Sequence, residues 1–157
     1  MSDQYTLVRD NDLRNENKVF RQCVKDIDPA IQVESYWVKT EDGYHLKLFR
    51  LVRPERSEFG PPVLMQHGLF QNAEKFVWDG ANSLAIELLD LGFDIWLGNN
   101  RGNIYSNIHD EYDMNHDQAD FYDYSFFEMG KYDQPAQIGG ILNFLPDHDN
   151  LIYVGYS

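Results

Sequence analysis

The sequence has few of the residues that build cross-linked or membrane-spanning proteins. Cys23 is the only cysteine in 157 residues, which excludes an internal disulfide framework and a cluster of thiolate metal ligands. No run of about 18 apolar residues is present, so no transmembrane segment is predicted. The N-terminus has no apolar stretch of signal-peptide length. If Met1 is the true start, we expect a cytoplasmic or lipid-droplet location, whereas an upstream start would allow a secreted or lysosomal one.

Basic residues are also scarce, because 13 Lys and Arg stand against 26 Asp and Glu, for a formal net charge of −13. That charge repels phosphate backbones and anionic membranes over about a Debye length, which argues against nucleic acid as a partner. Association with a neutral lipid interface stays open, since apolar contact would drive it. The hydrophobic content of 43 % is typical of a folded globular protein.

The polar beginning of the chain differs from the rest. Residues 1–18 are mixed in charge, and we expect a loosely held tail there, followed by one domain over residues 19–157. Residues 31–54 alternate around the turn-forming pair Asp42-Gly43, which predicts a β-hairpin. Three prolines and a glycine then predict a loop over residues 53–62.

Three apolar segments are predicted to be buried strands: residues 63–65, 93–99 and 150–157. Two helices are predicted between them, over residues 84–91 and 134–145. Alternating strands and helices imply an α/β fold, in which parallel strands follow the hairpin and helices form the crossovers.

The caps and faces of these two helices are also predicted. Ser83 and Asp133 are the expected N-caps. The first helix is expected to end at Gly92 and to share one face among three leucines, namely Leu84, Leu88 and Leu91.

The last predicted strand runs into the segment Gly155-Tyr156-Ser157. Gly-x-Ser is the beginning of a nucleophile elbow, G-x-S-x-G, in which a sharp strand-to-helix turn projects a serine hydroxyl above the sheet. Alone, this signal is weak. The segment Gln66 to Phe70, QHGLF, follows the first parallel strand, where such hydrolases place a loop that donates a backbone N–H to the oxyanion hole. The natural donor is the Leu69 amide.

Taken together, the motifs resemble the N-terminal half of the acid lipase family of α/β-hydrolases, which includes gastric and lysosomal acid lipases and steryl ester hydrolases. The resemblance rests on segments 33–51, 63–103, 125–136 and 151–157. It implies an incomplete α/β-hydrolase fold, with Ser157 as the nucleophile and Leu69 as one oxyanion donor. It further implies hydrolysis of triacylglycerols or steryl esters in lipid catabolism through a serine acyl-enzyme, with no metal or organic cofactor.

The chain departs from the family's pattern in one respect. The triad order is Ser, then Asp or Glu, then His, and all five histidines precede Ser157. Without a general base the serine hydroxyl is a poor nucleophile, so we expect these 157 residues alone to be an inactive and poorly soluble fragment. The alternative is a non-catalytic half-fold that binds a lipid or a protein partner.

Other candidate features have simpler interpretations. We interpret His67 as support for its loop, and not as a base. The carboxylate-rich segment 109–124 fits the EF-hand pattern poorly, so it is expected to be a solvated surface segment. Residues 97–103 lack phosphate-loop spacing and are expected to form a turn near the rim of the site. The aromatic residues expected in the core are Trp78, Trp96, Phe126 and Phe127.

Overall fold

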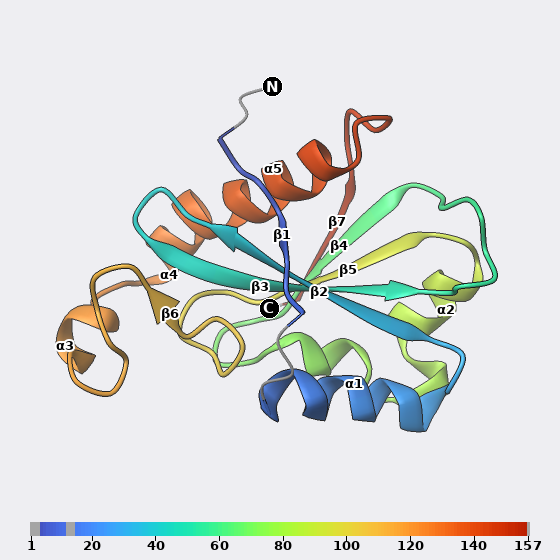
Figure 1. The fold of residues 1–157 in the computed structure, drawn as a ribbon, viewed down its shortest axis with the longest axis horizontal. Coiled ribbons are helices and arrows are strands. Elements are labelled where there is room, and N and C mark those ends of the chain that lie inside the picture. The colour runs from blue at the N-terminus through green and yellow to red at the C-terminus, as the bar shows by residue number, and fades with distance from the viewer. Residues whose placement is uncertain (1–3, 12–14, 157) are drawn as a thin grey trace.

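One mixed sheet organises the computed structural model, which describes residues 4–11 and 15–156 (Figure 1). Its strands are β1 (Val8–Arg9), β2 (Gln32–Lys39), β3 (Tyr44–Val52), β4 (Pro62–Gln66), β5 (Asp94–Gly98), β6 (Ile108–His109) and β7 (Ile152–Gly155). The helices are α1 (Asn15–Ile27), α2 (Leu84–Asp90), α3 (Gln118–Phe121), α4 (Phe126–Glu128) and α5 (Gln134–Phe144). Shorter turns are η1 (Ala73–Phe76), η2 (Gly80–Asn82) and the π-helical turn η3 (Met129–Asp133).

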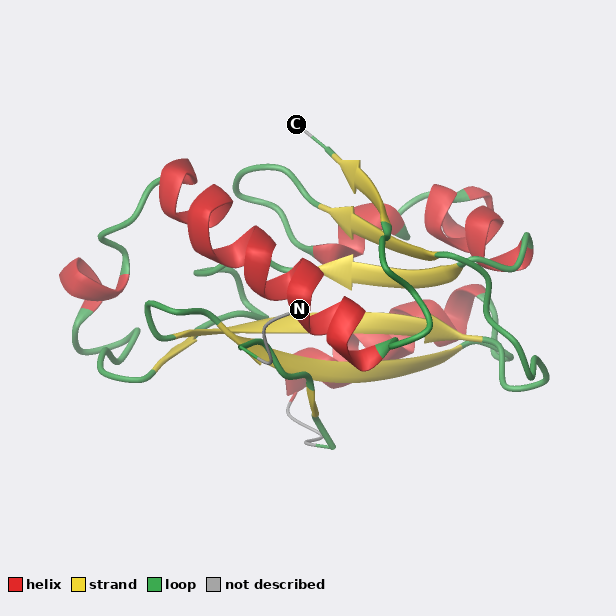
Figure 2. Ribbon diagram, turned by 90° about the horizontal axis from the view of Figure 1, so that it is seen from above, coloured by secondary structure: helices red, strands yellow, loops and turns green. Residues whose placement is uncertain are grey.

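The strand order is β1-β2-β3-β5-β4-β7, and β6 pairs with β3. The strands β2 and β3 form the predicted hairpin, and Gly43 in its turn has a φ of +97°. The strand β4 runs parallel to both β5 and β7. Helix α5 covers one face of the sheet, and α1 and α2 cover the other (Figures 1 and 2). The α/β prediction is therefore confirmed.

Side chains that alternate along the strands feed two separate hydrophobic cores. On β4, Val63 and Met65 face the α1 and α2 side, whereas Leu64 faces α5. The α1 side is organised around Phe49, which stacks on Phe20 with ring centroids 4.3 Å apart and meets Tyr105 edge-on at 5.0 Å. Apolar strands buried on both faces are what a sheet between two helical layers requires.

The segment predicted as a loosely held tail, residues 1–18, contains regular structure where it is described. The strand β1 pairs antiparallel with β2, and α1 begins at Asn15. Phe20 and Val24 of α1 are fully buried. Their spacing of four residues places both on one helix face, and this spacing was the available signal for α1.

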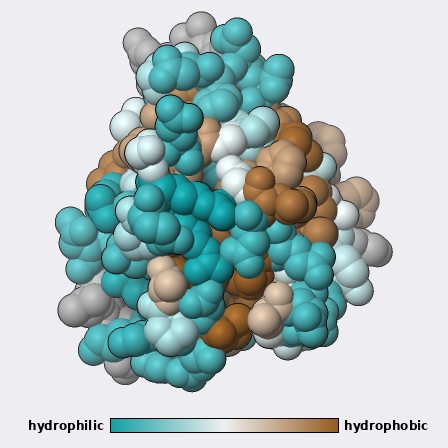
Figure 3. Space-filling model, turned by 90° about the vertical axis from the view of Figure 1, so that its right-hand side faces the viewer, coloured by the Kyte–Doolittle hydropathy of each residue, from teal (hydrophilic) through white to brown (hydrophobic). Residues whose placement is uncertain are grey.

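The predicted apolar face of α2 is wrong for Leu84 and Leu91, whereas Leu88 packs partly against the core. The helix and its end at Gly92 (φ +99°) are confirmed. Leu91 is 76 % exposed and Leu84 is also exposed, while the core receives Ala85, Ile86 and Leu89. A seven-residue helix rich in apolar residues offers more than one possible stripe, so periodicity alone does not select the buried one. Apolar residues accordingly reach the surface on the side where α2 lies (Figure 3).

Ser83 occupies the N-cap position of α2, but its side chain makes no capping bond. Its hydroxyl instead donates to the carbonyl of Gly80 at 2.5 Å. The turn η2 immediately before α2 brings that acceptor within reach.

Strand β7 is present, but it is not buried as predicted. It lies at the end of the described sheet and pairs with β4, and Ile152 and Tyr153 are exposed. Val154 alone packs partly against the core. The apolar run specified a strand correctly, but the burial of a strand depends on neighbours that its own residues do not encode.

Of the aromatic residues expected in the core, Trp96 is fully buried. The prediction is wrong for Trp78, Phe126 and Phe127, whose exposed fractions are 62 %, 79 % and 60 %. Phe126 and Phe127 lie in the three-residue helix α4, which a capping box between Ser125 and Glu128 closes. A helix this short presents no continuous face to the core.

Arg101 joins three distant parts of the chain. Its Nε donates to Asp133 Oδ1 at 2.8 Å, and its Nη1 and Nη2 donate to the two carboxylate oxygens of Asp42 at 2.7 and 2.8 Å. Asp133 is fully buried, and its second oxygen accepts from the Arg101 backbone N–H at 2.9 Å. The predicted capping role of Asp133 is therefore wrong, because the carboxylate is used by this ion cluster.

Phe49→Ala is expected to lower the free energy of unfolding by about 3–5 kcal/mol, because it removes the ring at the centre of the α1-side core. Phe126→Ala is the matched control, and its exposed ring should change stability by no more than about 0.5 kcal/mol. Chemical denaturation of both variants measures the difference. Equal losses would contradict the burial described for the two rings.

Arg101→Met is expected to cost about 3–5 kcal/mol, because two carboxylates would lose their partner while Asp133 stays buried. Arg9→Met removes the exposed ion pair with Glu34, and it should cost about 1 kcal/mol or less. Thermal and chemical unfolding compare the two variants. A small effect at Arg101 would show that the cluster does not hold these segments together.

Candidate active site

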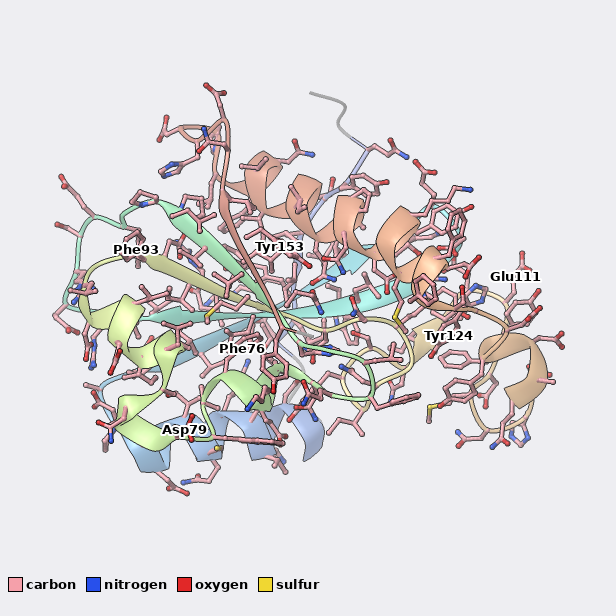
Figure 4. The ribbon with its side chains drawn as sticks, turned by 180° about the vertical axis from the view of Figure 1, so that it is seen from behind. Phe76, Asp79, Phe93, Glu111, Tyr124 and Tyr153 are labelled. Atoms are coloured by element: carbon pink, nitrogen blue, oxygen red, sulfur yellow. The ribbon has the colours of Figure 1, made fainter. Side chains whose placement is uncertain are left out.

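The candidate residues gather where β4, β5 and β7 end. A cavity of about 330 Å³ lies between the loop after β4 and the loop after β5. It is lined by residues 67–72 and 100–104, together with Tyr124 and Met129 (Tyr124 is labelled in Figure 4). Ligands in open α/β sheets bind outside the carboxyl ends of the strands, which is where this cavity lies.

Leu69 is the residue that the sequence predicts as an oxyanion donor. It lines the cavity and is 51 % exposed. Its backbone N–H makes no hydrogen bond within residues 4–11 and 15–156. A loop amide that lines a cavity without a protein partner is available to a ligand oxygen.

Ser157 lies outside the described residues, but the approach to it is described. The Tyr156 N–H donates to the Gln66 carbonyl at 2.9 Å, which continues the parallel pairing of β7 with β4. Tyr156 therefore lies beside the end of β4, three residues before Leu69. Gly155 and Tyr156, the described part of the predicted elbow, lie at the same edge of the sheet as the predicted oxyanion loop.

His67 supports this loop through both ring nitrogens. Its Nδ1 lies 2.8 Å from the Gly68 carbonyl, and its Nε2 lies 3.1 Å from the backbone nitrogen of Asn100. Since a carbonyl must accept and an N–H must donate, the ring carries its proton on Nδ1 and accepts at Nε2. Burial lowers the pKa of His67, against a raising effect of the Gly68 carbonyl. The ring is therefore a neutral support, as expected from the sequence.

Phe70 follows Leu69 with an unusual backbone. Its φ is +60°, the left-handed region that disfavours residues with a side chain, and its ring is 99 % exposed. The Gln71 N–H donates to the Gly68 carbonyl at 3.2 Å, so residues 68–71 form a turn with Phe70 in third place. Positive φ in third place is what a type II turn requires.

The loop after β5 contributes asparagines that sequence reasoning described only as a turn near the rim. Asn103 Nδ2 lies 3.2 Å from His67 Nε2 and donates to Asn99 Oδ1 at 3.0 Å. Asn103 Oδ1 accepts from the backbone N–H groups of Tyr105 and Ser106, each at 2.9 Å. Polar residues directly after a buried strand were the signal for this network. Residues 100–103 of the predicted turn line the cavity, whereas Leu97 and Gly98 belong to β5.

The described residues form neither a metal-binding cluster nor a helix that could span a membrane. Within the described residues, no group of three or more His, Cys, Asp or Glu side chains could hold a metal ion. His109, at the start of the carboxylate-rich segment, lies against the Asp42 carbonyl at 2.9 Å from its Nε2. No helix in the described parts of the chain is long and apolar enough to cross a bilayer.

Comparison with known proteins identifies relatives of this chain. A family model described as a partial alpha/beta-hydrolase lipase region matches residues 29–80. Lysosomal acid lipase/cholesteryl ester hydrolase from Homo sapiens is 43 % identical over 129 residues, which cover 79 % of this chain and 32 % of that protein. Lipase member M from Homo sapiens is 42 % identical, over 79 % and 30 % of the two chains.

Gastric triacylglycerol lipase from Rattus norvegicus is 39 % identical, and the alignment covers 79 % of this chain and 32 % of that protein. A solved structure of a hypothetical protein from Pseudomonas aeruginosa aligns with 80 % of this chain and 33 % of its own, at a TM-score of 0.39 and 11 % identity. That likeness is too distant to support an argument. The chain spans about a third of the length of the curated relatives it matches. By these similarities and by its α/β architecture, the chain belongs to the acid lipase family of α/β-hydrolases.

Proposed function

We propose that this chain carries the nucleophile and half of the oxyanion hole of a lipase that hydrolyses triacylglycerols or steryl esters. The observation that carries the proposal is the Leu69 amide, which lies at the cavity near β7 and has no hydrogen-bond partner among the described residues. Relatives named as triacylglycerol lipase and cholesteryl ester hydrolase support both substrate classes. Residues 19–157 would then form the N-terminal half of the catalytic domain.

In the proposed reaction, Ser157 Oγ attacks the ester carbonyl and loses its proton to a general base. The carbonyl oxygen becomes an oxyanion that accepts a hydrogen bond from the Leu69 N–H. Collapse breaks the bond to the alcohol, which leaves with the proton, and water then hydrolyses the acyl-serine. One preorganised donor contributes about 3–4 kcal/mol of transition-state stabilisation.

The general base in this proposal comes from outside these 157 residues. All five histidines precede Ser157, and His67 already uses both ring nitrogens in its loop. Loss of a triad member costs several orders of magnitude in rate. We therefore expect the 157 residues alone to be inert toward esters.

The apolar rim of the cavity supports association with a neutral lipid surface. Leu69, Phe70 and Ile104 all line the cavity and are all exposed. An exposed apolar cluster around a polar loop is typical of a binding surface. The net charge of −13 favours an uncharged ester interface over an anionic membrane.

A fluorophosphonate probe should fail to label the 157-residue chain and should label a longer chain that continues past Ser157 with a downstream Asp and His. Ser157→Ala in the longer chain should abolish that labelling. Mass spectrometry of the modified peptide locates the label. A longer chain that folds and stays unlabelled would overturn the proposal and favour a binding half-fold.

Phe70→Asp should weaken binding to a neutral triolein emulsion at least tenfold, because a charged group would replace the most exposed ring at the rim. Leu91→Asp is the matched control, since it adds the same charge at an exposed leucine outside the cavity lining and should bind like the wild type. Flotation of the protein with the emulsion measures binding. Equal losses in both variants would show that the change in net charge, and not the position of Phe70 at the rim, weakens binding.

A further inference from the structure

We infer that Gln134 and Tyr153 are positioning residues, which tie the strand leading to the nucleophile to the loop that holds the oxyanion amide. The inference rests on the proposed function, and it concerns a bridge of side chains on the α5 side of the sheet. Tyr153 lies on β7 beside α5, as Figure 4 shows. Gln134 is the first residue of α5.

The bridge is a continuous series of hydrogen bonds. The Tyr153 hydroxyl donates to Gln134 Oε1 at 3.0 Å, and Gln134 Nε2 donates to Asn100 Oδ1 at 2.8 Å. The Asn100 backbone N–H donates to His67 Nε2 at 3.1 Å, and His67 Nδ1 donates to the Gly68 carbonyl at 2.8 Å. One glutamine thereby connects β7, α5 and the loop after β5 with the loop after β4.

The last bond of the series bears directly on the oxyanion donor. The Gly68 carbonyl and the Leu69 N–H belong to one planar trans peptide, so they point in opposite directions. His67 holds this carbonyl together with the Gln71 N–H, and it thereby helps to set the direction of the Leu69 N–H. An error of about 1 Å between reacting groups can cost about a hundredfold in rate, so the register between β7 and this peptide matters for the chemistry.

The backbone alone leaves this register lightly supported. Strand β7 has four residues, lies at the end of the described sheet and pairs with β4 within the described residues. The bridge attaches β7 a second time, through side chains that lie on the α5 side of the sheet. The Asn100 bond to His67 is buried and the Asn100 bond to Gln134 is partly buried, whereas the Tyr153 bond to Gln134 is exposed.

The charged surroundings of His67 make its titration a clean reporter of the bridge. The nearest charged side chain along the loop after β5 is Arg101, and its charge is paired with Asp42 and Asp133. Burial and the Gly68 carbonyl set the shift in the pKa of His67. The bond that Nε2 accepts from the Asn100 N–H also favours the neutral ring, so loss of that bond should raise the pKa of His67.

The test uses Tyr153→Phe, Gln134→Met and the double variant of the 157-residue chain. Each single variant should lower the folding equilibrium constant about two- to tenfold. The double variant should match Gln134→Met, because Tyr153 has lost its partner there. Nuclear magnetic resonance should show the lowered pKa of His67 rising in each variant. Tyr112→Phe is the control, since its hydroxyl makes no hydrogen bond in the described part of the chain.

The inference would be overturned if the two single losses in the folding equilibrium constant multiplied in the double variant. It would also be overturned if the pKa of His67 equalled the wild-type value in both single variants. If Gln134→Met fails to fold, Tyr153→Phe still gives the His67 readout. Neither measurement depends on turnover. A failed fluorophosphonate label would thus refute the proposed lipase activity and leave the bridge intact, whereas an unchanged His67 would refute the bridge alone.

Discussion

The site depends on the shared register of three parallel strands. Gln66 at the end of β4 pairs with Gly98 of β5 on one side and with Gly155 of β7 on the other. The strands therefore end at one level, and the loops that follow them meet above the sheet. Glycine at Gly98 is part of this arrangement, because a side chain there would meet the amide oxygens of Gln66 and Gln137. Close approach of buried amides explains the absence of a side chain better than backbone freedom does.

Arg101 ties the loop after β5 to parts of the chain outside these three strands. Its guanidinium lies 4.0 Å from the centroid of the Tyr44 ring, and its N–H groups bind Asp42 in the hairpin turn and Asp133 in η3. A buried ion cluster of this kind contributes specificity as much as stability, since only one arrangement satisfies both carboxylates. The loop after β5 is consequently held by two sets of contacts, those of Arg101 and those of the asparagine network around Asn103.

The parts of the fold that the sequence predicts are those set by local pattern. Alternation and Asp42-Gly43 identify the hairpin, and the continuous apolar runs identify β4 and β5. The errors concern partners far away in the chain. Asp133 has the chemistry of a cap, yet Arg101 competes for it from 32 residues away. The exposure of Trp78 and Phe126 likewise depends on what packs over them, which composition does not state.

Motifs in the sequence predict the site, but they do not predict the side chains that support it. The Gly68-Leu69 step is recognisable because its chemistry requires a particular spacing, whereas Asn100 and Gln134 form their bond across 34 residues. Phe70 illustrates a different consequence. A left-handed backbone costs about 1–2 kcal/mol, and no burial of the ring compensates for it in the described protein. A glycine at position 70 would therefore make a more stable protein. Phe70 lowers the stability of the fold, which indicates that its side chain serves another purpose. Natural variation at this position would show how strictly that purpose requires an aromatic ring.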